Sequence, residues 1–365
     1  MPRKHHPMTR ARLRDLGVII GELPTGLYNA ITDVPGVWVG HTTLIYDQPR
    51  VARTGVTVIR PRYGEIYKDQ CFAGYHSFNG NGEMTGLLWL EESGQLGTPI
   101  ALTNTHQVGV VRDALVDYEA RHHPDAAWLL PVVAETYDGW LNDINGFHIA
   151  HDHVFAALDA AASGPIAEGN VGGGAGMICH DFKGGIGGAS RVVEVAGELY
   201  TVGVLVQANY GDRPDLRVDG APVGREIPAA EVPLPWERPR ASGSIIIIIA
   251  TDAPLLPYQC RRLAQRATVG LARVGGVGHN GSGDIFLAFA TGNHIPSDAR
   301  RPTELAYLPN QQMNPLFYAT IEAVEESVLN ALTGAETMVG QQGRIAHALP
   351  LDRLQTLLAG KRILG

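Results

Sequence analysis

The chain has 365 residues, of which 45% are hydrophobic and 18% charged, a composition typical of a soluble globular protein with one large domain or two smaller ones. The net charge of −8, with no clearly basic face, argues against a nucleic-acid partner, and the longest clean apolar run (245–250) is too short to span a membrane. The basic N-terminus lacks the apolar core of a secretory signal, so we expect a cytoplasmic protein in which residues 1–14 form a mobile tail.

The first half of the chain is predicted to contain both strands and helices. Short β-branched segments between turn-forming residues predict strands over 55–61 and 99–105. Helical spacing of apolar residues predicts helices over 107–120 and 148–163. The second helix carries the metal-like sequence 151–153 (HDH), but adjacent helical positions point in different directions, so we interpret it as a solvated helix face.

A glycine-rich segment follows at 168–176 (EGNVGGGAG). It could cradle a phosphate, but it does not follow a clear strand in the register of a dinucleotide-binding fold. A tight turn or a close approach of two backbones is therefore favoured. Next, apolar alternation on both sides of Ala196-Gly197-Glu198 predicts a β-hairpin over 191–209.

The second half of the chain contains the strongest predictions. The segment 244–251 (SIIIIIAT) has no alternation, which favours a strand buried on both faces in the middle of a covered sheet. Helices are predicted over 256–273 and 313–333. In the latter, Asn314 is expected to cap the helix, and one apolar stripe is expected to face the core: Phe317, Ile321, Val324, Val328 and Leu332.

The chain has none of the common catalytic or metal-binding motifs. HExxH, GxxxxGK[ST] and GxSxG are absent. The three cysteines (Cys71, Cys179 and Cys260) are odd in number and widely spaced, so we expect buried free thiols and not a disulfide framework or zinc site.

The segment 211–243 has six prolines and no sustained period. Structureless segments of this length are usually linkers or functional loops. It ends at Gly243-Ser244, directly before the buried strand, so we expect it to present that junction.

One reaction requires a serine at such a junction. In that reaction, the Ser244 hydroxyl would attack the carbonyl of Gly243 and shift the acyl group from nitrogen to oxygen, and hydrolysis of the ester would then cut the chain. The released α-amine has a reference pKa of about 7.7–8.0, so it is partly neutral at physiological pH and can act as general base for its own hydroxyl. A plain turn is the competing interpretation.

The segment 243–289 (GSIIIIIATDAPLLPYQC…HNGSGDIFLAF) resembles the β-chain start of the L-aminopeptidase/D-amidase-D-esterase family, also known through its β-aminopeptidases. Four further segments resemble the same family: 29–43, 168–191, 221–228 and 337–354. The resemblance implies a precursor that cleaves itself between Gly243 and Ser244. The α-chain 1–243 and β-chain 244–365 would remain together as one catalytic domain.

The resemblance also implies a fold and an assembly. The fold is a four-layered α/β/β/α sandwich that resembles N-terminal-nucleophile hydrolases with different connectivity and is shared with ornithine acetyltransferases. The assembly is a homo-oligomer of αβ units, for example a tetramer. Neither a metal nor a cofactor is implied, and no membrane or nucleic acid is expected as a partner.

The family's site residues match positions in this sequence. Ser244 matches the nucleophile, and Asn209 matches the residue whose amide helps to form the oxyanion hole. Ser282 and Asp284 match a serine and an acidic residue that set the protonation of the nucleophile. Tyr137 matches a pocket tyrosine.

Further residues are expected at the substrate pocket. The segment from Asn79 to Glu83 (NGNGE) is expected to line it, and Asp284 or Glu135 is expected to hold the substrate's amino group. We therefore expect a self-processing serine aminopeptidase that releases N-terminal residues from small peptides, amides or esters. Two alternatives remain: an acyltransferase of the ornithine acetyltransferase type, or a binding protein that is never processed and holds a phosphate at 168–176.

Overall fold

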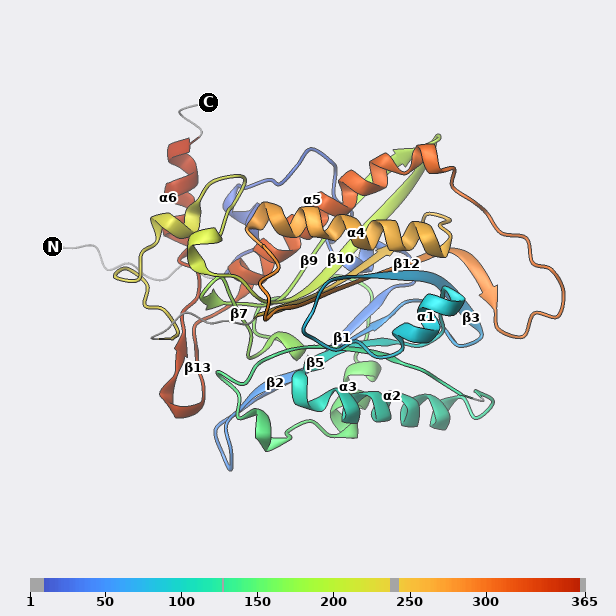
Figure 1. Cartoon of the computed structure of the whole chain (residues 1–365), viewed down its shortest axis with the longest axis horizontal. Helices are drawn as coiled ribbons and strands as arrows, with labels where there is room; N and C mark the ends of the chain where they lie inside the picture. The colour runs from blue at the N-terminus through green and yellow to red at the C-terminus, as the bar shows by residue number, and fades with distance from the viewer. Residues whose placement is uncertain (1–9, 127, 237–242, 362–365) are drawn as a thin grey trace.

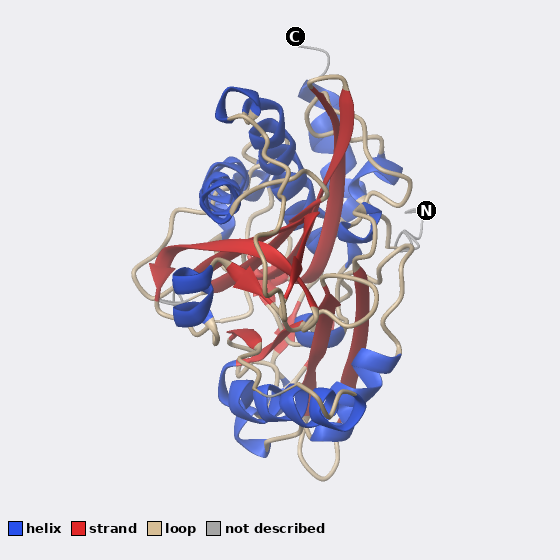
Figure 2. Ribbon diagram, turned by 90° about the vertical axis from the view of Figure 1, so that its right-hand side faces the viewer, coloured by secondary structure: helices blue, strands red, loops and turns tan. Residues whose placement is uncertain are grey.

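The computed structural model describes residues 10–126, 128–236 and 243–361. Two β-sheets pack face to face at its centre, and helices cover the outer face of each (Figures 1 and 2). None of the helices in the described ranges is both long and apolar enough to cross a membrane.

The first sheet has four strands in the order β1-β2-β5-β6. Only β5 and β6 run parallel to each other. The predicted strands at 55–61 and 99–105 are confirmed as β2 and β5. The strand bounds are β1 (Trp38–Tyr46), β2 (Ala52–Arg60), β5 (Ile100–Asn104) and β6 (Val132–Thr136).

The second sheet has six strands in the order β4-β3-β12-β11-β10-β9. Its central strand β11 pairs parallel with β12 and antiparallel with β10, and all of its residues are buried, as predicted. The predicted hairpin is confirmed as β9–β10, with positive φ at Ala196 and Gly197, as a type I′ turn requires. The bounds are β4 (Gln95–Leu96), β3 (Asp69–Gly80), β12 (Gly283–Pro296), β11 (Ser244–Thr251), β10 (Glu198–Asn209) and β9 (Gly185–Val195).

Helices form the two outer layers. α2 (Val108–His122) and α3 (His151–Asp159) pack on the first sheet, and α4 (Pro257–Val274) and α5 (Asn314–Gly334) pack on the second. A buried apolar cluster fills each of the three spaces between layers. The predicted four-layered α/β/β/α sandwich is confirmed. The smaller elements are α1 (Leu87–Ser93), α6 (Leu351–Lys361), β7 (Ile178–Cys179), β8 (Phe182–Lys183), β13 (Met338–Val339) and β14 (Ile345–Ala346).

Two helix predictions need correction. α3 is shorter than the predicted range 148–163. In α5, the N-cap is Met313, so the Asn314 side chain does not cap the helix. This helix is also buried on nearly all sides instead of along one stripe, because β9, β10 and α4 all pack against it. Its buried Glu322 and Glu326 pair with the fully buried Arg191.

The prediction of a mobile tail over 1–14 is wrong for residues 10–14, and residues 1–9 lie outside the described ranges. Arg10 donates to the carbonyls of Leu332 and Leu349. Arg12 and Arg14 form ion pairs with buried glutamates, and Leu13 is fully buried. Residues 10–14 are therefore held against the rest of the fold by hydrogen bonds, ion pairs and a buried side chain.

The glycine-rich segment 168–176 is a close backbone approach, as favoured. A Cβ at Gly173 would lie 2.7 Å from the Leu102 carbonyl oxygen, and one at Gly174 would lie 2.4 Å from the Ile186 nitrogen. The segment thus packs against backbone of both sheets, where side chains do not fit. The three cysteines are buried and free, as predicted.

Candidate active site

Four strands of the second sheet meet at one edge, where most of the predicted site residues lie. β10 ends at Asn209, β11 begins at Ser244, β12 begins at Gly283 and β3 ends at Gly80. Cross-strand pairing joins these four residues in that order. The Gly243–Ser244 peptide therefore lies at the centre of this edge. Before it, the described part of the segment 211–243 contains two short 3₁₀ turns and an isolated β-bridge between Val218 and Ala221, and 237–242 lie outside the described residues.

The Gly243 carbonyl is held by two donors. The Ser244 hydroxyl donates to this oxygen at 2.6 Å, and the Gly283 N–H donates to it at 3.1 Å. The Gly283 nitrogen also lies 3.4 Å from Ser244 Oγ. Ser244 itself is only 5% exposed. A hydroxyl, the carbonyl before it and a polarising N–H thus converge in a site largely closed to solvent.

Gly283 is a site residue that the sequence analysis missed. Its contact with the Gly243 carbonyl is made by its backbone N–H, so its residue type gives no chemical signal in the sequence. The parallel register between β11 and β12, which places Gly283 opposite Ser244, would have identified it, but that register is a property of the fold.

The Asn209 amide is held in one orientation, and Asn209 pairs across the sheet with Ser244. Its Oδ1 accepts from the Ile178 N–H at 2.9 Å, and its Nδ2 donates to the Tyr137 carbonyl at 3.0 Å. Tyr137 therefore reaches Asn209 through its backbone. Its side chain is 41% exposed and lies close to Gly139, where a Cβ would come within 2.4 Å of the tyrosine hydroxyl oxygen.

Ser282 and Asp284 form a buried pair on the other side of Ser244. The Ser282 hydroxyl donates to Asp284 Oδ1 at 2.5 Å, and Asp284 pairs across the sheet with Ile245. Burial raises the pKa of the Asp284 carboxyl, although hydrogen bonds from the Ser282 hydroxyl and the Ile245 N–H oppose the shift. The pair therefore places a partly desolvated carboxyl group next to the start of β11.

The predicted pocket residues divide into two roles. Asn79 donates to the carbonyls of His279 and Ser282, both at 2.6 Å, so it holds the turn before β12. Glu135 is 3% exposed, and its carboxylate accepts from the Glu83 N–H and the Thr105 hydroxyl.

Glu135 lies close to the strand ends where Ser244 and Gly283 pair. A Cβ at Gly82 would lie 3.2 Å from Glu135 Oε1 and 3.0 Å from the Gly283 Cα. Gly82 therefore packs between the Glu135 carboxylate and Gly283. Burial raises the pKa of the Glu135 carboxyl, and the hydrogen bonds that it accepts lower it. The structure thus brings a second buried carboxyl group to the same edge.

Beside the Gly243–Ser244 bond lies a cavity of about 10 Å³, which is room for about one water molecule. It is lined by Gly243, Ser282 and Asp284, together with Tyr210, Gly211, Asp212, Trp236, Val277, Gly278 and His279. In the uncleaved chain, this side of the site is therefore almost filled by the chain itself.

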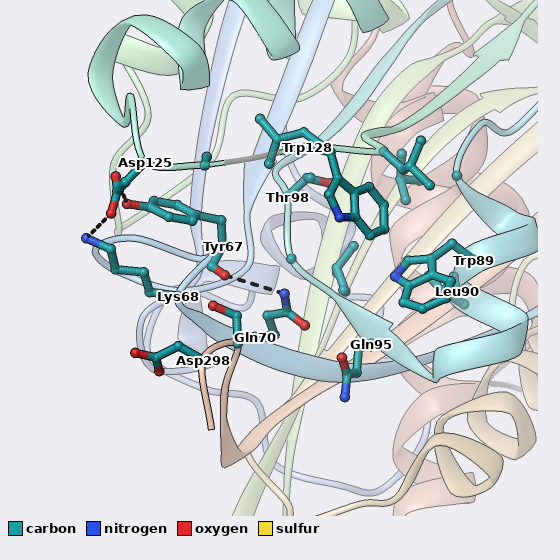
Figure 3. A pocket seen from close by; sticks show the side chains of 18 residues that line it. Tyr67, Lys68, Gln70, Trp89, Leu90, Gln95, Thr98, Asp125, Trp128 and Asp298 are labelled. Atoms are coloured by element: carbon teal, nitrogen blue, oxygen red, sulfur yellow. Dashed lines mark hydrogen bonds and ion pairs between the residues drawn. The ribbon is translucent and has the colours of Figure 1, made fainter. Parts of the chain in front are cut away.

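A larger cavity, of about 480 Å³, lies elsewhere (Figure 3). Its wall includes Trp89 and Trp128, whose rings form a T-shaped pair. It also includes Asp125, which accepts a hydrogen bond from the Tyr67 hydroxyl and forms an ion pair with Lys68. Its lining comes from the start of β3 and β6 and from the chain after β12, whereas Ser244 lies at the opposite strand ends. This cavity is therefore separate from the predicted site.

Within the described ranges, the one group of metal-type side chains is Asp212, Asp215 and His279, whose ligand atoms all lie within 4.8 Å of one another. Acidic groups commonly gather without an ion, and no further feature here points to one. The sequence 151–153 does not form such a group, because His151 instead contacts Asp117 of α2 at 3.1 Å.

Comparison with known proteins identifies the family of the chain. Residues 29–346 match the model of peptidase family S58. The "Beta-peptidyl aminopeptidase BapA" of Sphingosinicella microcystinivorans is 48% identical, over 97% of this chain and 93% of its own length.

Two solved structures are similar over nearly the whole chain. A Burkholderia sp. beta-aminopeptidase is 53% identical with a TM-score of 0.90, covering 96% of this chain and 99% of that one. An L-aminopeptidase D-Ala-esterase/amidase from Ochrobactrum anthropi, described as a variant of the Ntn hydrolase fold, is 43% identical with a TM-score of 0.90, covering 97% and 99%. The chain therefore belongs to peptidase family S58, and it is a hydrolase of the serine aminopeptidase type.

Proposed function

We propose that Ser244 is the nucleophile of this aminopeptidase and that the chain activates itself by cleavage between Gly243 and Ser244. The observation that carries the proposal is the geometry of the uncleaved bond. The Ser244 hydroxyl lies against the Gly243 carbonyl, and the Gly283 N–H donates to the same oxygen. These contacts place the hydroxyl next to the carbonyl group that it would attack in an N-to-O acyl shift, and they aim a donor at the oxygen on which the negative charge would develop.

Self-cleavage proceeds in two steps. Ser244 Oγ bonds to the Gly243 carbonyl carbon while the carbon–nitrogen bond breaks, and the hydroxyl proton passes to the departing amine. The resulting ester is hydrolysed by water, which leaves a carboxylate on Gly243 and restores the Ser244 hydroxyl. The water-sized cavity beside the bond supports this second step, because Gly243 and Asp284 both line it.

In the mature enzyme, the Ser244 α-amine acts as general base for its own hydroxyl. The Gly283 N–H and the Asn209 amide stabilise the oxyanion on the substrate. Asn209 is proposed for this role because it pairs across the sheet with Ser244 and because its amide is oriented by the Ile178 N–H and the Tyr137 carbonyl. Ser282 and Asp284 set the protonation of the nucleophile.

The proposed substrates are small peptides, amides and esters with a free amino group. The names of the relatives support this class, since they describe β-peptidyl aminopeptidases and an L-aminopeptidase with D-Ala-esterase/amidase activity. A cationic amino group needs a carboxylate, and Glu135 and Asp284 are the buried carboxyl groups at this edge of the sheet. We assign the amino group to one of them, with the segment 79–83 beside it.

The substitution Ser244→Ala tests the proposal. We expect a chain that stays full-length on a denaturing gel and is inactive toward aminoacyl amides, whereas the wild type gives two bands. Ser327→Ala is the matched control, because Ser327 is also buried but donates to a carbonyl within α5. Cleavage at Gly243 in the Ser244→Ala chain would refute the assignment.

The assembly and compartment are further parts of the proposal. We propose a homo-oligomer of αβ units, for example a tetramer, in the cytoplasm. Three buried free cysteines are consistent with a reducing compartment. Light scattering on the processed protein measures the assembly, and a mass equal to one αβ unit would contradict it.

A further inference from the structure

Lys183 is a buried cation that the proposed mechanism does not use. It lies in β8 and is fully buried. Its ammonium donates to two backbone carbonyls, those of Gly184 at 2.8 Å and Gly174 at 3.3 Å. Within the described ranges, no carboxylate forms an ion pair with it. An ammonium in such a place has lost its hydration, and burial lowers its pKa to about 7.

The two carbonyls belong to segments that meet behind the active site. Gly174 is part of the glycine-rich segment between the sheets, and Gly184 follows the short β7–β8 hairpin. Lys183 pairs directly with Ile178 in that hairpin, and the Gly184 N–H donates to the Met177 carbonyl. The lysine therefore fixes the position of the backbone around Ile178.

The Ile178 N–H is the donor that holds the Asn209 side chain at 2.9 Å. Asn209 in turn pairs across the sheet with Ser244. A continuous chain of contacts thus leads from the Lys183 ammonium, through the hairpin and the Asn209 amide, to the nucleophile. Each link is a buried hydrogen bond or a strand pair.

We propose that Lys183 is a positioning residue that aims the Asn209 amide at the oxyanion during self-cleavage and substrate turnover. It acts through Ile178 and Asn209, without touching the substrate. The inference rests on the proposed role of Asn209 and Ser244. It gives a reason for a lysine at a position where charging the side chain is costly and where no carboxylate of the described residues pairs with it.

The substitution Lys183→Met keeps the length of the side chain and removes the donors. We expect slower self-cleavage and a kcat lowered roughly 10- to 100-fold, less than the ~10²–10³ of losing an oxyanion donor itself. KM should stay within about twofold, because an interaction realised in the transition state is lost. Rates are normalised to the amount of released β-chain on a denaturing gel.

A second variant guards against a simple folding defect. Lys183→Gln restores an N–H donor without charge, so we expect it to recover part of the lost kcat. Gln259→Met is the matched control, because Gln259 is also fully buried and donates to the carbonyl of Leu308 at 2.7 Å, away from the site. It should lower the melting temperature and leave kcat unchanged.

A double-mutant cycle with Asn209→Ala separates positioning from general destabilisation. If Lys183 acts through the Asn209 amide, Lys183→Met should change kcat by less than about threefold once that amide is absent. An equal loss of kcat in both backgrounds, or a Lys183→Met enzyme as fast as the wild type, would overturn the inference. Either result would leave the proposed nucleophile intact if Ser244→Ala remains uncleaved.

Discussion

Close packing of Gly283 against the segment 79–83 leaves no room for a side chain, and the same packing holds its backbone N–H in place. A Cβ there would lie 2.6 Å from the Asn81 carbonyl oxygen and 2.7 Å from the Gly82 Cα. The segment 79–83 can pack this closely only against a glycine. That packing keeps the Gly283 N–H at 3.1 Å from the Gly243 carbonyl, so the pocket loop and the proposed oxyanion donor depend on each other.

We therefore predict that Gly283→Ala impairs self-cleavage. The added methyl group collides with backbone and not with a flexible side chain, so the start of β12 must move away from Gly243. Losing one oxyanion donor costs roughly 10²–10³ in rate. Cleavage should slow by at least tenfold, measured as the appearance of the β-chain with time on a denaturing gel.

Gly109→Ala is the control for Gly283→Ala. Nothing lies within 4 Å of a Cβ at Gly109, which is inside α2, so this change should stabilise the helix slightly and leave cleavage unchanged. Cleavage of Gly283→Ala at the wild-type rate would show that its N–H does not assist the reaction.

How far the sequence predicts the site depends on what each residue contributes. The roles proposed for Ser244, Asn209 and Asp284 depend on side chains within long motifs, so the family resemblance points to them. The role proposed for Gly283 depends on its backbone N–H, and Lys183 stands out only because it is buried and no carboxylate of the described residues pairs with it. Neither property is visible until strand register and burial are known.

Among the elements, β11 shows why five isoleucines stand in a row. Ile245, Ile247 and Ile249 pack in the cluster with α4 and α5, whereas Ile246 and Ile248 pack in the cluster between the sheets. A strand with an apolar layer on each side needs no polar face. The sequence predicted this double burial correctly, because a strand without alternation has no polar face to turn toward solvent.

The helix α5 was located correctly by its periodicity, but its burial was not predicted. Its Glu322 and Glu326 appear in the sequence as residues of a solvent face. Both are buried, and Arg191 of β9 reaches them at 2.9 and 2.7 Å. The charged partner is far away in the sequence, so periodicity within one segment cannot reveal the ion pairs.

We predict that Arg191→Met destabilises the attachment of α5 to the sheet. The change leaves two buried glutamates without their fully buried partner, and breaking such a pair typically costs about 3–5 kcal/mol. Urea unfolding measures this loss. Arg50→Met is the control, because the more exposed pair of Arg50 with Asp143 should contribute at most about 1 kcal/mol. Equal losses for both variants would contradict the role of Arg191.

In the whole molecule, the proposed cut would divide the chain into two, but the strands of both parts would remain paired in the second sheet. In the second sheet, the β-chain strands β11 and β12 lie between the α-chain strands β10 and β3. The β-chain helix α5 packs on β9 and β10 of the α-chain and holds Arg191. Separating the chains would break two long antiparallel pairings and expose the middle of the second sheet.

We therefore predict that the processed chains behave as one unit. After cleavage, the two bands seen on a denaturing gel should elute together in size-exclusion chromatography, at the volume of the uncleaved Ser244→Ala precursor. Both proteins should unfold in a single thermal transition. The cut removes one covalent link at a strand end, while the interleaved strands keep their hydrogen bonds and their buried faces.

The Ser244→Ala precursor is the reference for this comparison, because it has the same strands and lacks only the cut. Separate elution of the α- and β-chains, or two distinct transitions after processing, would mean that 1–243 and 244–365 are independent folding units. A single catalytic domain shared by both chains would then be untenable, since Asn209 and Ser244 come from opposite sides of the cut and must remain paired for the site to exist.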